Sequence, residues 1–238
     1  MRWVWIIALG VCVGERTLAQ WETLKLSLVL RGSYTTTSKV FYNPDSPSPT
    51  LRAQHLPLED IYGYGFELRI QRPEDSYFLA ITVDFLSKSL NQDQFIALTN
   101  PPRFLPVMEG IRSIPVELSL RTYVPLGSEN FHLFMGGGIG MYFAERVLRV
   151  VDADAKPQRS SVGYGIHVES GLEYQLHPAV RINLEMRFRD PEIRTVNRFD
   201  RETTVHEGSI VLLPKGDIAT KVNLDGLNFG LGVILSIP

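Results

Sequence analysis

The chain has 238 residues, of which 44% are hydrophobic and 21% charged, with a formal net charge of −2. This slight acidic excess argues against nucleic acid as a partner. No run of 18 apolar residues occurs, which argues against a transmembrane helix. The single cysteine, Cys12, lies in the N-terminal leader, so we expect no disulfide in the mature fold.

Residues 1–19 have the pattern of a secretory signal peptide. Arg2 provides the positive start, residues 3–13 form an apolar stretch, and residues 17–19 (Thr-Leu-Ala) form a small-residue cleavage site. We therefore expect an exported protein whose mature chain begins at Gln20. The leader carries two basic residues and one acidic residue, so the mature net charge would be −3. An uncleaved N-terminal anchor is the alternative.

Strict alternation of apolar and polar residues recurs in eight stretches after the leader. In residues 116–124, Val116 and Leu118 point one way while Glu117 and Ser119 point the other. Side chains alternate between the two faces of a strand, so each stretch predicts a strand with one apolar and one charged face. The predicted strands are 24–34, 61–71, 77–85, 116–124, 131–143, 162–176, 180–188 and 227–237.

The connections between these strands alternate between short and long. The short ones are 72–76, 125–130 and 176–179, and the long ones are 35–60, 87–109, 145–160 and 190–223. An even number of strands joined in this way is typical of an all-β, eight-stranded antiparallel up-and-down transmembrane β-barrel with short periplasmic turns and long extracellular loops. One barrel domain would occupy residues 20–238. We expect a poorly helical first loop, and a strand 180–188 that projects past the membrane.

The apolar positions predict the lipid-facing surface. Aromatic residues lie at both ends of the strands and aliphatic residues lie between them, as in two aromatic belts around an apolar band. The belts comprise Tyr77, Phe131 and Tyr174 beside the short turns, and Tyr34, Tyr62, Tyr64, Phe85, Phe143, Tyr164 and Phe188 toward the long loops. We expect no aromatic side chains packed inside the barrel. A soluble, lipocalin-like barrel of reversed polarity is the competing architecture.

The opposite positions predict a charged lumen. They carry Lys25, Arg31, Glu67, Arg69, Asp84, Glu117, Arg121, Glu169, Glu173, Arg181, Glu185 and Arg187, together with many glycines. An eight-stranded barrel is just wide enough for its own side chains, and buried charges are retained mainly where they are paired. We therefore expect a salt-bridged plug, with an ion path or gate as the alternative. Strand pairing should join either Glu173 to Arg181 or Glu169 to Arg187.

Two more detailed expectations concern residues 116–143. A two-residue turn at Gly127-Ser128 would pair Ser119 with Gly136. Arg31 and Arg69 would fill the space beside the inward glycines of the outer half and pair with Glu67 or Glu117. If so, Gly138→Leu should disturb the lumen, whereas Gly137→Leu should only add apolar surface on the lipid side.

The chain resembles the small eight-stranded bacterial outer-membrane β-barrels of the OmpA transmembrane-domain, OmpX and OmpW type. The resemblance rests on the leader, strand count and loop pattern, and on segments such as 116–121 (VELSLR) and 227–232 (LNFGLG). It implies a bacterial outer-membrane location, contact with outer-membrane lipid and lipopolysaccharide, insertion by the barrel assembly machinery, and a monomer. The chain departs from such proteins at its end, Ser236-Ile237-Pro238, where an aromatic residue is usual.

No catalytic, cofactor or metal motif stands out. Membrane hydrolases need a histidine beside a serine or a carboxylate. His132 and His167 lie at different heights of the predicted barrel, His177 lies in a turn, and His55 and His206 lie in loops. We therefore predict a non-enzymatic barrel without a cofactor, whose loops bind an extracellular ligand or support the envelope. The alternatives are a narrow passive pore and, third, a lipid A-modifying enzyme.

Overall fold

The computed structural model describes residues 24–96, 103–125 and 128–237. In this part of the chain, eight antiparallel strands close into a ring in the order β1-β2-β3-β4-β5-β7-β8-β13, with β13 paired to β1. The ring strands are β1 (Lys25–Phe41), β2 (His55–Gln71), β3 (Tyr77–Ile96), β4 (Arg103–Val124), β5 (Phe131–Val150), β7 (Gly163–His177), β8 (Val180–Arg189) and β13 (Leu227–Ile237). The predicted barrel and its eight strands are confirmed.

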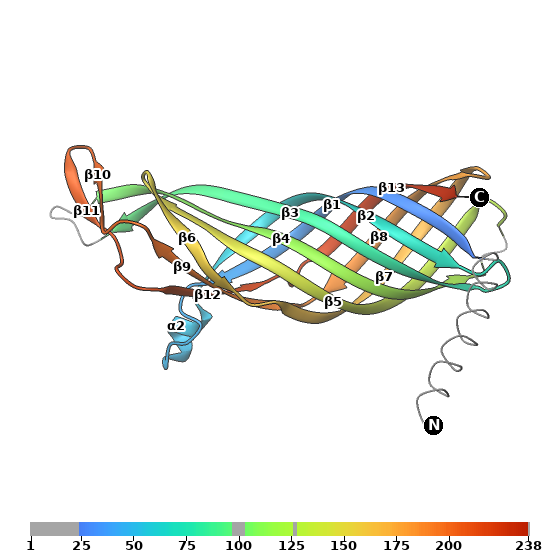
Figure 1. Ribbon diagram of the computed structural model, residues 1–238, viewed down its shortest axis with the longest axis horizontal. Coiled ribbons are helices and arrows are strands. Elements are labelled where there is room, and N and C mark those ends of the chain that lie inside the picture. The colour runs from blue at the N-terminus through green and yellow to red at the C-terminus, as the bar shows by residue number, and fades with distance from the viewer. Residues whose placement is uncertain (1–23, 97–102, 126–127, 238) are drawn as a thin grey trace, which may run out of the picture.

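The strands continue well past the length that a bilayer requires. About ten residues suffice to cross it, yet β3, β4 and β5 have 20, 22 and 20 residues. Beyond the ring, β6 (Ala153–Ser160), β9 (Glu192–Phe199) and β12 (Ile218–Asn223) extend the wall from β5 round to β1. Much of what was expected to be loop is therefore strand, and Figure 1 shows the resulting long tube. The strand expected to project past the membrane, β8, ends at Arg189, and the chain continues outward after a two-residue break as a separate strand, β9.

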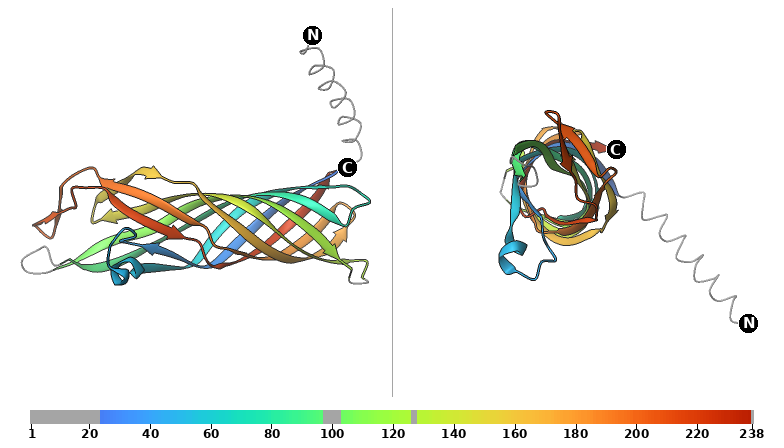
Figure 2. Two further views of the ribbon diagram at one scale, coloured as in Figure 1. Left: turned by 90° about the horizontal axis from the view of Figure 1, so that it is seen from below. Right: turned by 90° about the vertical axis from the view of Figure 1, so that its left-hand side faces the viewer.

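Two smaller elements complete the outer part. The first connection contains α2 (Pro49–Ala53), a five-residue helix; the expectation of a poorly helical segment was wrong there, because Pro49 suits the first turn of a helix. A separate hairpin of β10 (Thr203–His206) and β11 (Ser209–Leu212) lies at the end of the tube (Figures 1 and 2). Within the described chain, no helix has the length and apolar character needed to cross a membrane.

The polarity of the wall inverts along each long strand. On β4, Leu118 and Ile114 face outward and are 45% and 40% exposed, whereas the next outward residue, Arg112, is charged. On the inner face the order is opposite, because Glu117 is buried in the lumen and Ile111 is buried farther out. A lipid-facing surface must be apolar and a water-facing surface can be charged. The inversion therefore marks the outer edge of the membrane.

Beyond that edge, the tube encloses an apolar core. One cluster comprises Val40, Leu56, Leu58, Ile61, Leu86, Ile111, Tyr142, Ala144, Ile193, Val222 and Leu224. A second cluster, farther from the membrane, comprises Leu105, Val107, Leu148, Val150, Ala153, Ala155, Phe199, Val211 and Leu213. The inner face of the β10–β11 hairpin contributes Val211 to this second cluster. The outer tube is thus a packed β-structure with a hydrophobic interior.

The lipid-facing surface agrees with the sequence prediction. Tyr62, Tyr64 and Tyr164 are 67%, 69% and 72% exposed. Cross-strand aromatic pairs form both belts, with ring centroids 5.4 Å apart for Tyr34–Tyr62 toward the outside and 4.8 Å apart for Phe131–Tyr174 beside the short turns. A soluble barrel would leave these rings in water. The arrangement therefore supports the membrane-spanning barrel over the lipocalin-like alternative.

The register between β4 and β5 differs from the predicted one by two residues. Ser119 lies opposite Gly138, and Gly136 lies opposite Arg121. Gly127 falls outside the described residues, but the pairing begins at Val124 and Leu133, so the connection is longer than a two-residue turn. A shift of two residues keeps every side chain on its face because the side-chain period of a strand is two. The predicted faces are therefore right although the predicted partners are wrong.

The polarity inversion predicts that the same substitution has different effects at two outward positions of one strand. Leu118→Lys places a charge in the lipid-facing band and should lower the free energy of unfolding by about 2–4 kcal/mol. Met108→Lys, also outward on β4 but beyond the inversion, should change it by less than about 0.5 kcal/mol. Equilibrium unfolding in lipid vesicles measures both values. Similar losses in the two variants would place the membrane edge elsewhere.

Close packing between strands predicts which glycines can be replaced. A Cβ added at Gly138 would lie 1.9 Å from the Leu118 carbonyl oxygen, and one at Gly137 would lie 2.6 Å from the His167 carbonyl oxygen. The expectation that Gly137→Leu is harmless was therefore wrong, because the neighbouring backbone leaves no room. At Gly32, exposed on β1, nothing lies within 4 Å of the added atom.

Gly138→Ala should accordingly destabilise the barrel by about 1–3 kcal/mol, whereas Gly32→Ala should fold like the wild type. The fraction of heat-modifiable, folded protein on unheated gels reports the difference. Equal folded fractions for the two variants would show that the β4–β5 contact is looser than described.

Candidate functional site: the charged lumen

The lumen of the membrane-spanning part holds a network of carboxylates and guanidinium groups. Among the described residues, six acidic and six basic side chains take part, so the network is neutral. They are Glu67, Asp84, Glu117, Glu169, Glu173 and Glu185 with Arg31, Arg69, Arg121, Arg181, Arg187 and Arg189. Each lies at an inward position of its strand. Burying charges in a membrane is tolerated when every charge has an opposite partner.

Arg187, on β8, connects three of the carboxylates. Its Nη2 lies 2.6 Å from Glu185 Oε1 and 2.9 Å from Glu169 Oε2, and its Nη1 bonds Glu117. Arg187 and Glu169 are also direct cross-strand partners on β8 and β7. All four side chains are 0% exposed. Arg187 therefore links β4, β7 and β8 through a single side chain.

Two further arginines complete the outer half of the network. Arg31 Nη2 lies 2.6 Å from Asp84 Oδ2, and Arg31 Nη1 bonds Glu185. Arg189 Nη1 lies 3.2 Å from Glu117 Oε1 and 3.7 Å from Asp84 Oδ2. Asp84 and Glu185 are therefore each shared between guanidinium groups of β1 and β8, whereas Glu117 is held by two arginines of β8.

The inner half of the network is organised around Glu67. Arg121 Nη2 lies 2.7 Å from Glu67 Oε2, and Arg69 Nε lies 2.6 Å from Glu67 Oε1. Arg121 also reaches Glu169, with 2.7 Å between Nε and Oε1, while Arg69 bonds Glu173. β2 and β7, which carry Arg69 and Glu173, are four places apart in the eight-strand ring. This ion pair therefore crosses the barrel.

The network ends near the short turns. Arg181 Nη1 donates to Glu173 Oε2 at 2.7 Å and to the Tyr123 hydroxyl at 3.1 Å, and its side chain is 16% exposed. Of the two predicted pairings of β7 with β8, the register has Glu169 opposite Arg187, and Arg181, opposite Gln175, reaches Glu173 diagonally. Lys25, predicted to belong to the lumen, lies at the end of β1 with an exposed side chain. Because the strand begins there, Lys25 reaches solvent instead of the network.

Aromatic side chains do pack inside this end of the barrel, contrary to expectation. Phe78 and Phe134 are 2% and 0% exposed, and their ring centroids are 6.0 Å apart. The Arg69 Cζ lies 5.1 Å from the Phe78 centroid, and the Arg121 Cζ lies 5.1 Å from the Phe134 centroid. The rings thus cover the guanidinium groups and stabilise their positive charge by cation–π attraction. The lipid-facing belts remain outside, so the barrel is not inverted.

The space beside the inward glycines is filled by different side chains from those predicted. A Cβ at Gly136 would meet the Arg121 side chain at 2.9 Å, and one at Gly140 would meet the Tyr142 hydroxyl at 2.7 Å. Arg69 pairs with Glu67 as predicted, but Arg31 pairs with neither Glu67 nor Glu117. In the actual register of β4 with β5, Arg121 and Tyr142 of this strand pair lie beside the glycines and occupy the space that was predicted for Arg31 and Arg69.

Sequence reasoning missed two members of the network. Arg189 follows Arg187 by two residues, but the predicted strand ended at 188. Tyr142, on β5, donates a hydrogen bond to Glu117 Oε1 at 2.7 Å and is 0% exposed. The period-two pattern carried one residue farther identifies Arg189, and the same pattern places Tyr142 inward.

A serine and a histidine meet in the lumen without forming a hydrolytic triad. Ser119 Oγ lies 2.8 Å from His167 Nε2. Glu169 Oε1 lies 3.8 Å from the same nitrogen, whereas the acid of a triad binds Nδ1. His167 Nδ1 has no hydrogen-bond partner among the described residues. Ser119 is 0% exposed and His167 is 2% exposed, so a substrate has no approach to them. Within the described chain, no group of three or more potential ligands is placed to hold a metal ion.

A separate buried ion pair, outside the lumen network, lies in the outer tube. Arg146 Nε donates to Glu109 Oε1 at 2.7 Å, and the Arg146 Cζ lies 5.7 Å from the Tyr42 ring centroid. Partial burial and the adjacent Glu109 carboxylate raise the pKa of Tyr42 to about 12. Asn197, on β9, also donates hydrogen bonds from Nδ2 to the carbonyl oxygens of Arg146 on β5 and Ala155 on β6, and so connects these strands. This polar layer is part of the tube's interior, and the sequence analysis did not predict it.

Comparisons with known proteins agree with this architecture. No protein-family model and no curated protein matches the sequence. Among solved structures, the outer membrane protein OprG from Pseudomonas aeruginosa is similar with a TM-score of 0.54 at 12% identity, covering 89% of this chain and 95% of OprG. Neisserial surface protein A has a TM-score of 0.42 at 11% identity, covering 88% of this chain and 96% of that one. The likeness to OprG, together with the ring of eight strands, shows that the chain has the fold of the small outer-membrane β-barrels.

Proposed function

We propose that this chain is a monomeric, non-enzymatic integral protein of the bacterial outer membrane, with a sealed lumen and a rigid outer tube that serves binding or envelope integrity. The leader predicted for residues 1–19 would direct export, and the barrel assembly machinery would insert the mature chain. The lipid-facing band would contact outer-membrane lipid and lipopolysaccharide. The outer tube would stand in the extracellular space.

The ion-paired lumen is the observation that carries this proposal. Ten of its twelve charged side chains are 0–1% exposed, and Arg69 and Arg181 are 3% and 16% exposed. An aqueous pore would leave its lining side chains exposed to water. Beyond the network, the apolar clusters of the outer tube fill the next layer. Both layers support a closed barrel over the alternative of a narrow passive pore.

The outer tube supports a role at the surface. Its charged outer face carries ion pairs such as Arg198–Asp217 at 2.5 Å and Lys156–Asp200 at 3.0 Å. The Lys156 ammonium lowers the pKa of Asp200. In contrast, the outward face of the β10–β11 hairpin exposes Val205, Ile210 and Leu212 by 60–69%. Apolar groups left in water on a rigid scaffold are typical of interaction surfaces. The hairpin is therefore the place where a ligand would bind.

Planar-bilayer recording tests the proposal directly. The wild-type barrel should give no resolvable single-channel current, because no water-filled path passes the ion-paired layer. Arg187→Glu should raise the leak, since it leaves Glu117, Glu169 and Glu185 without their shared partner. Arg198→Glu reverses a charge on the outside of the tube and should leave the barrel silent.

A charge swap restores the neutrality of the network and so serves as the control for the single substitution. In the double variant Arg187→Glu/Glu117→Arg, the network is again neutral, and the leak should fall below that of Arg187→Glu. Steady channels in the wild type, or a leak from Arg198→Glu as large as that from Arg187→Glu, would contradict a sealed lumen and favour the passive pore.

A further inference from the structure

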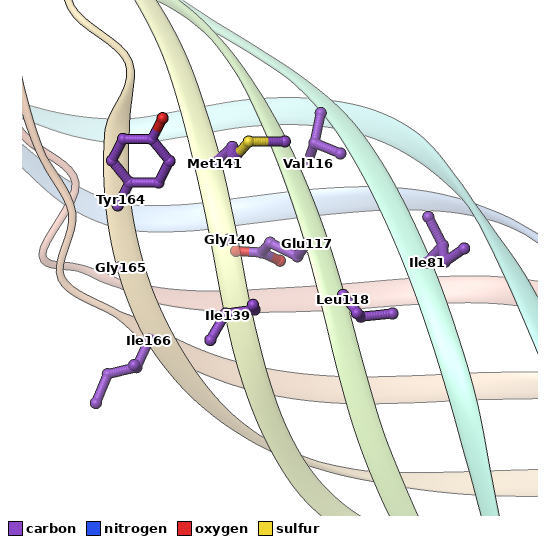
Figure 3. A pocket seen from close by; sticks show the side chains of 10 residues that line it. All are labelled: Ile81, Val116, Glu117, Leu118, Ile139, Gly140, Met141, Tyr164, Gly165 and Ile166. Carbon is purple, nitrogen blue, oxygen red and sulfur yellow. The ribbon is translucent and has the colours of Figure 1, made fainter. Parts of the chain in front are cut away.

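In the membrane-spanning part, each strand of the wall pairs with both of its neighbours. Ile81, Leu118 and Ile139, for example, lie in one lipid-facing row across β3, β4 and β5, where they line a pocket (Figure 3). β2 and β3 pair at ten consecutive positions, and the last pair toward the outside is Tyr62–Ser87. In the described chain, both strands continue past this pair without any further pairing between them. The outer tube therefore has a seam between β2 and β3.

The seam begins at Asp60 on β2. Its φ of 56° lies in the left-handed region, and Leu58 and Ile61 are both 0% exposed, so the alternation of faces is interrupted there. The Tyr34 hydroxyl donates to Asp60 Oδ1 at 2.7 Å, and Lys88 Nζ donates to the Asp60 carbonyl oxygen at 3.2 Å. Farther out, β2 lies toward α2 while β3 lies toward the β10–β11 hairpin (Figure 1). The two strands are thus joined at the membrane edge and diverge beyond it.

The edge of β3 that faces the seam has free backbone hydrogen-bonding groups. The Phe85 carbonyl oxygen points toward β2, where it would lie 2.6 Å from a Cβ at Gly63. The Lys88 carbonyl oxygen points the other way, toward β4, where it would clash with a Cβ at Gly110. Because backbone groups alternate in direction along a strand, the seam is faced by those of three exposed residues, Ser89, Asn91 and Asp93.

We call these three residues the free edge. Asp93 confirms the direction of its backbone groups, since its partner on β4 is Pro106, which has no N–H and whose carbonyl oxygen accepts from Val151 on the opposite side. No strand of the described chain pairs with the free edge on the seam side. A row of unpaired N–H and C=O groups is a template for another strand.

The opposite edge, on β2, is less suited to pairing. The backbone nitrogen of Thr37 on β1 would lie 2.8 Å from a Cβ at Gly226, so Thr37 faces away from β2, and Lys39 does so by alternation. Their partners on β2, Glu59 and Pro57, therefore face the seam. Pro57 has no N–H, and proline is typical of edges that are protected from pairing. Residues 88–93 of β3 contain no proline.

We propose that the free edge binds an extended peptide segment of a partner protein, which adds a strand antiparallel to β3. Donors and acceptors repeated at every second residue match those of another strand, so the edge itself defines this class of occupant. Inward side chains of the added strand would face Leu90, which packs against the apolar cluster that contains Leu58. The partner segment is therefore apolar at every second residue.

The rim of the seam favours basic residues at the alternate positions of the partner. Residues 55–61 and 88–93 carry three exposed carboxylates, those of Glu59, Asp60 and Asp93, and one ammonium group, that of Lys88. Outward side chains of the added strand would lie beside these carboxylates. The partner segment therefore alternates apolar with basic or polar residues.

A second barrel in the same membrane does not fit the free edge. The β3 strands of both barrels would run outward in the same direction, and strand tilts of 35–45° would make them cross at roughly 70–90°. An antiparallel pair is therefore impossible between them, whereas a separate peptide can lie along β3. The proposal rests on the proposed function only for placing the outer tube outside the cell, and it concerns a surface other than the β10–β11 hairpin.

Two methylated forms of a synthetic peptide test the added strand. The probe has about eight residues, the length of an ordinary strand, and alternates valine with lysine. In an antiparallel pair, residues that exchange hydrogen bonds carry their side chains on the same face, so the outward lysines would bond the free edge. Methylation of the lysine peptide nitrogens should weaken binding at least about tenfold. Methylation of the valine peptide nitrogens, with the same charge and composition, is the matched control and should leave binding intact.

A pair of substitutions in the full chain tests the edge from the other side. Asn91→Pro removes the N–H at the centre of the free edge and leaves the pairing with β4, because that N–H does not face β4. Asn91→Ala removes only the side chain. Fluorescence anisotropy of the labelled, unmethylated peptide with each form folded in phosphatidylcholine nanodiscs should give at least about tenfold weaker binding for Asn91→Pro than for Asn91→Ala. Mobility on unheated gels shows that both variants are folded.

Hydrogen–deuterium exchange of the wild type should slow at Ser89, Asn91 and Asp93 when the peptide binds. No saturable binding to the wild type, equal affinity for the two methylated peptides, or equal binding by Asn91→Pro and Asn91→Ala would each overturn the proposal. A wild-type dimer that Asn91→Pro abolishes would assign the edge to a second copy and overturn it as well. None of these measurements depends on single-channel current, so their failure is distinct from a failure of the sealed lumen.

Discussion

The pairing of six carboxylates with six arginines inside the membrane-spanning lumen is the constraint on which the rest of the structure depends. A lone charge in this setting would cost several kcal/mol, so the barrel must bring together strands that are not neighbours. Arg69 on β2 reaches Glu173 on β7, four places away in the ring, and Arg187 on β8 reaches Glu117 on β4. The glycines of β5 and β7 leave room for these long side chains. The same network fixes Tyr142 through its hydrogen bond to Glu117.

The long strands solve a second problem, because one wall passes through two solvents. Within the bilayer the outer face must be apolar and the interior can be charged, and outside the bilayer the reverse holds. In both parts, side chains alternate between the faces with a period of two. Only the residue types on each face change, as between the outward residues Ile114 and Arg112 on β4. The outer tube thus has an apolar interior, like that of a soluble β-protein, and it continues the membrane barrel, whose interior is charged. At the far end, the β10–β11 hairpin packs Val211 on the second apolar cluster.

The sequence predicted the membrane-spanning part well because a strand's period of two fixes the face of each residue. Strand number, the aromatic belts and eleven of the twelve predicted lumen residues follow from that period; only Lys25, at a strand end, does not. Register and partners were not predictable, because a shift of two residues keeps all faces and changes every pair, as at Ser119 and Gly138. The outer strands were missed because the inverted polarity and the proline-rich composition of residues 35–60 and 87–109 conceal the pattern. The inner rings of Phe78 and Phe134 were missed because their burial depends on guanidinium groups from other strands.

Cysteine accessibility tests the sealed lumen most directly, since the only native cysteine, Cys12, lies in the predicted leader. Ser119 is 0% exposed within the ion-paired layer, whereas Ser89 is exposed on β3 beyond the membrane edge. Serine and cysteine are close in size, so Ser119→Cys and Ser89→Cys should both fold. A small, membrane-impermeant thiol reagent applied to both sides of intact vesicles should label Ser89→Cys rapidly and leave Ser119→Cys unlabelled. Labelling of both variants at similar rates would show a water-filled path through the lumen and contradict the account.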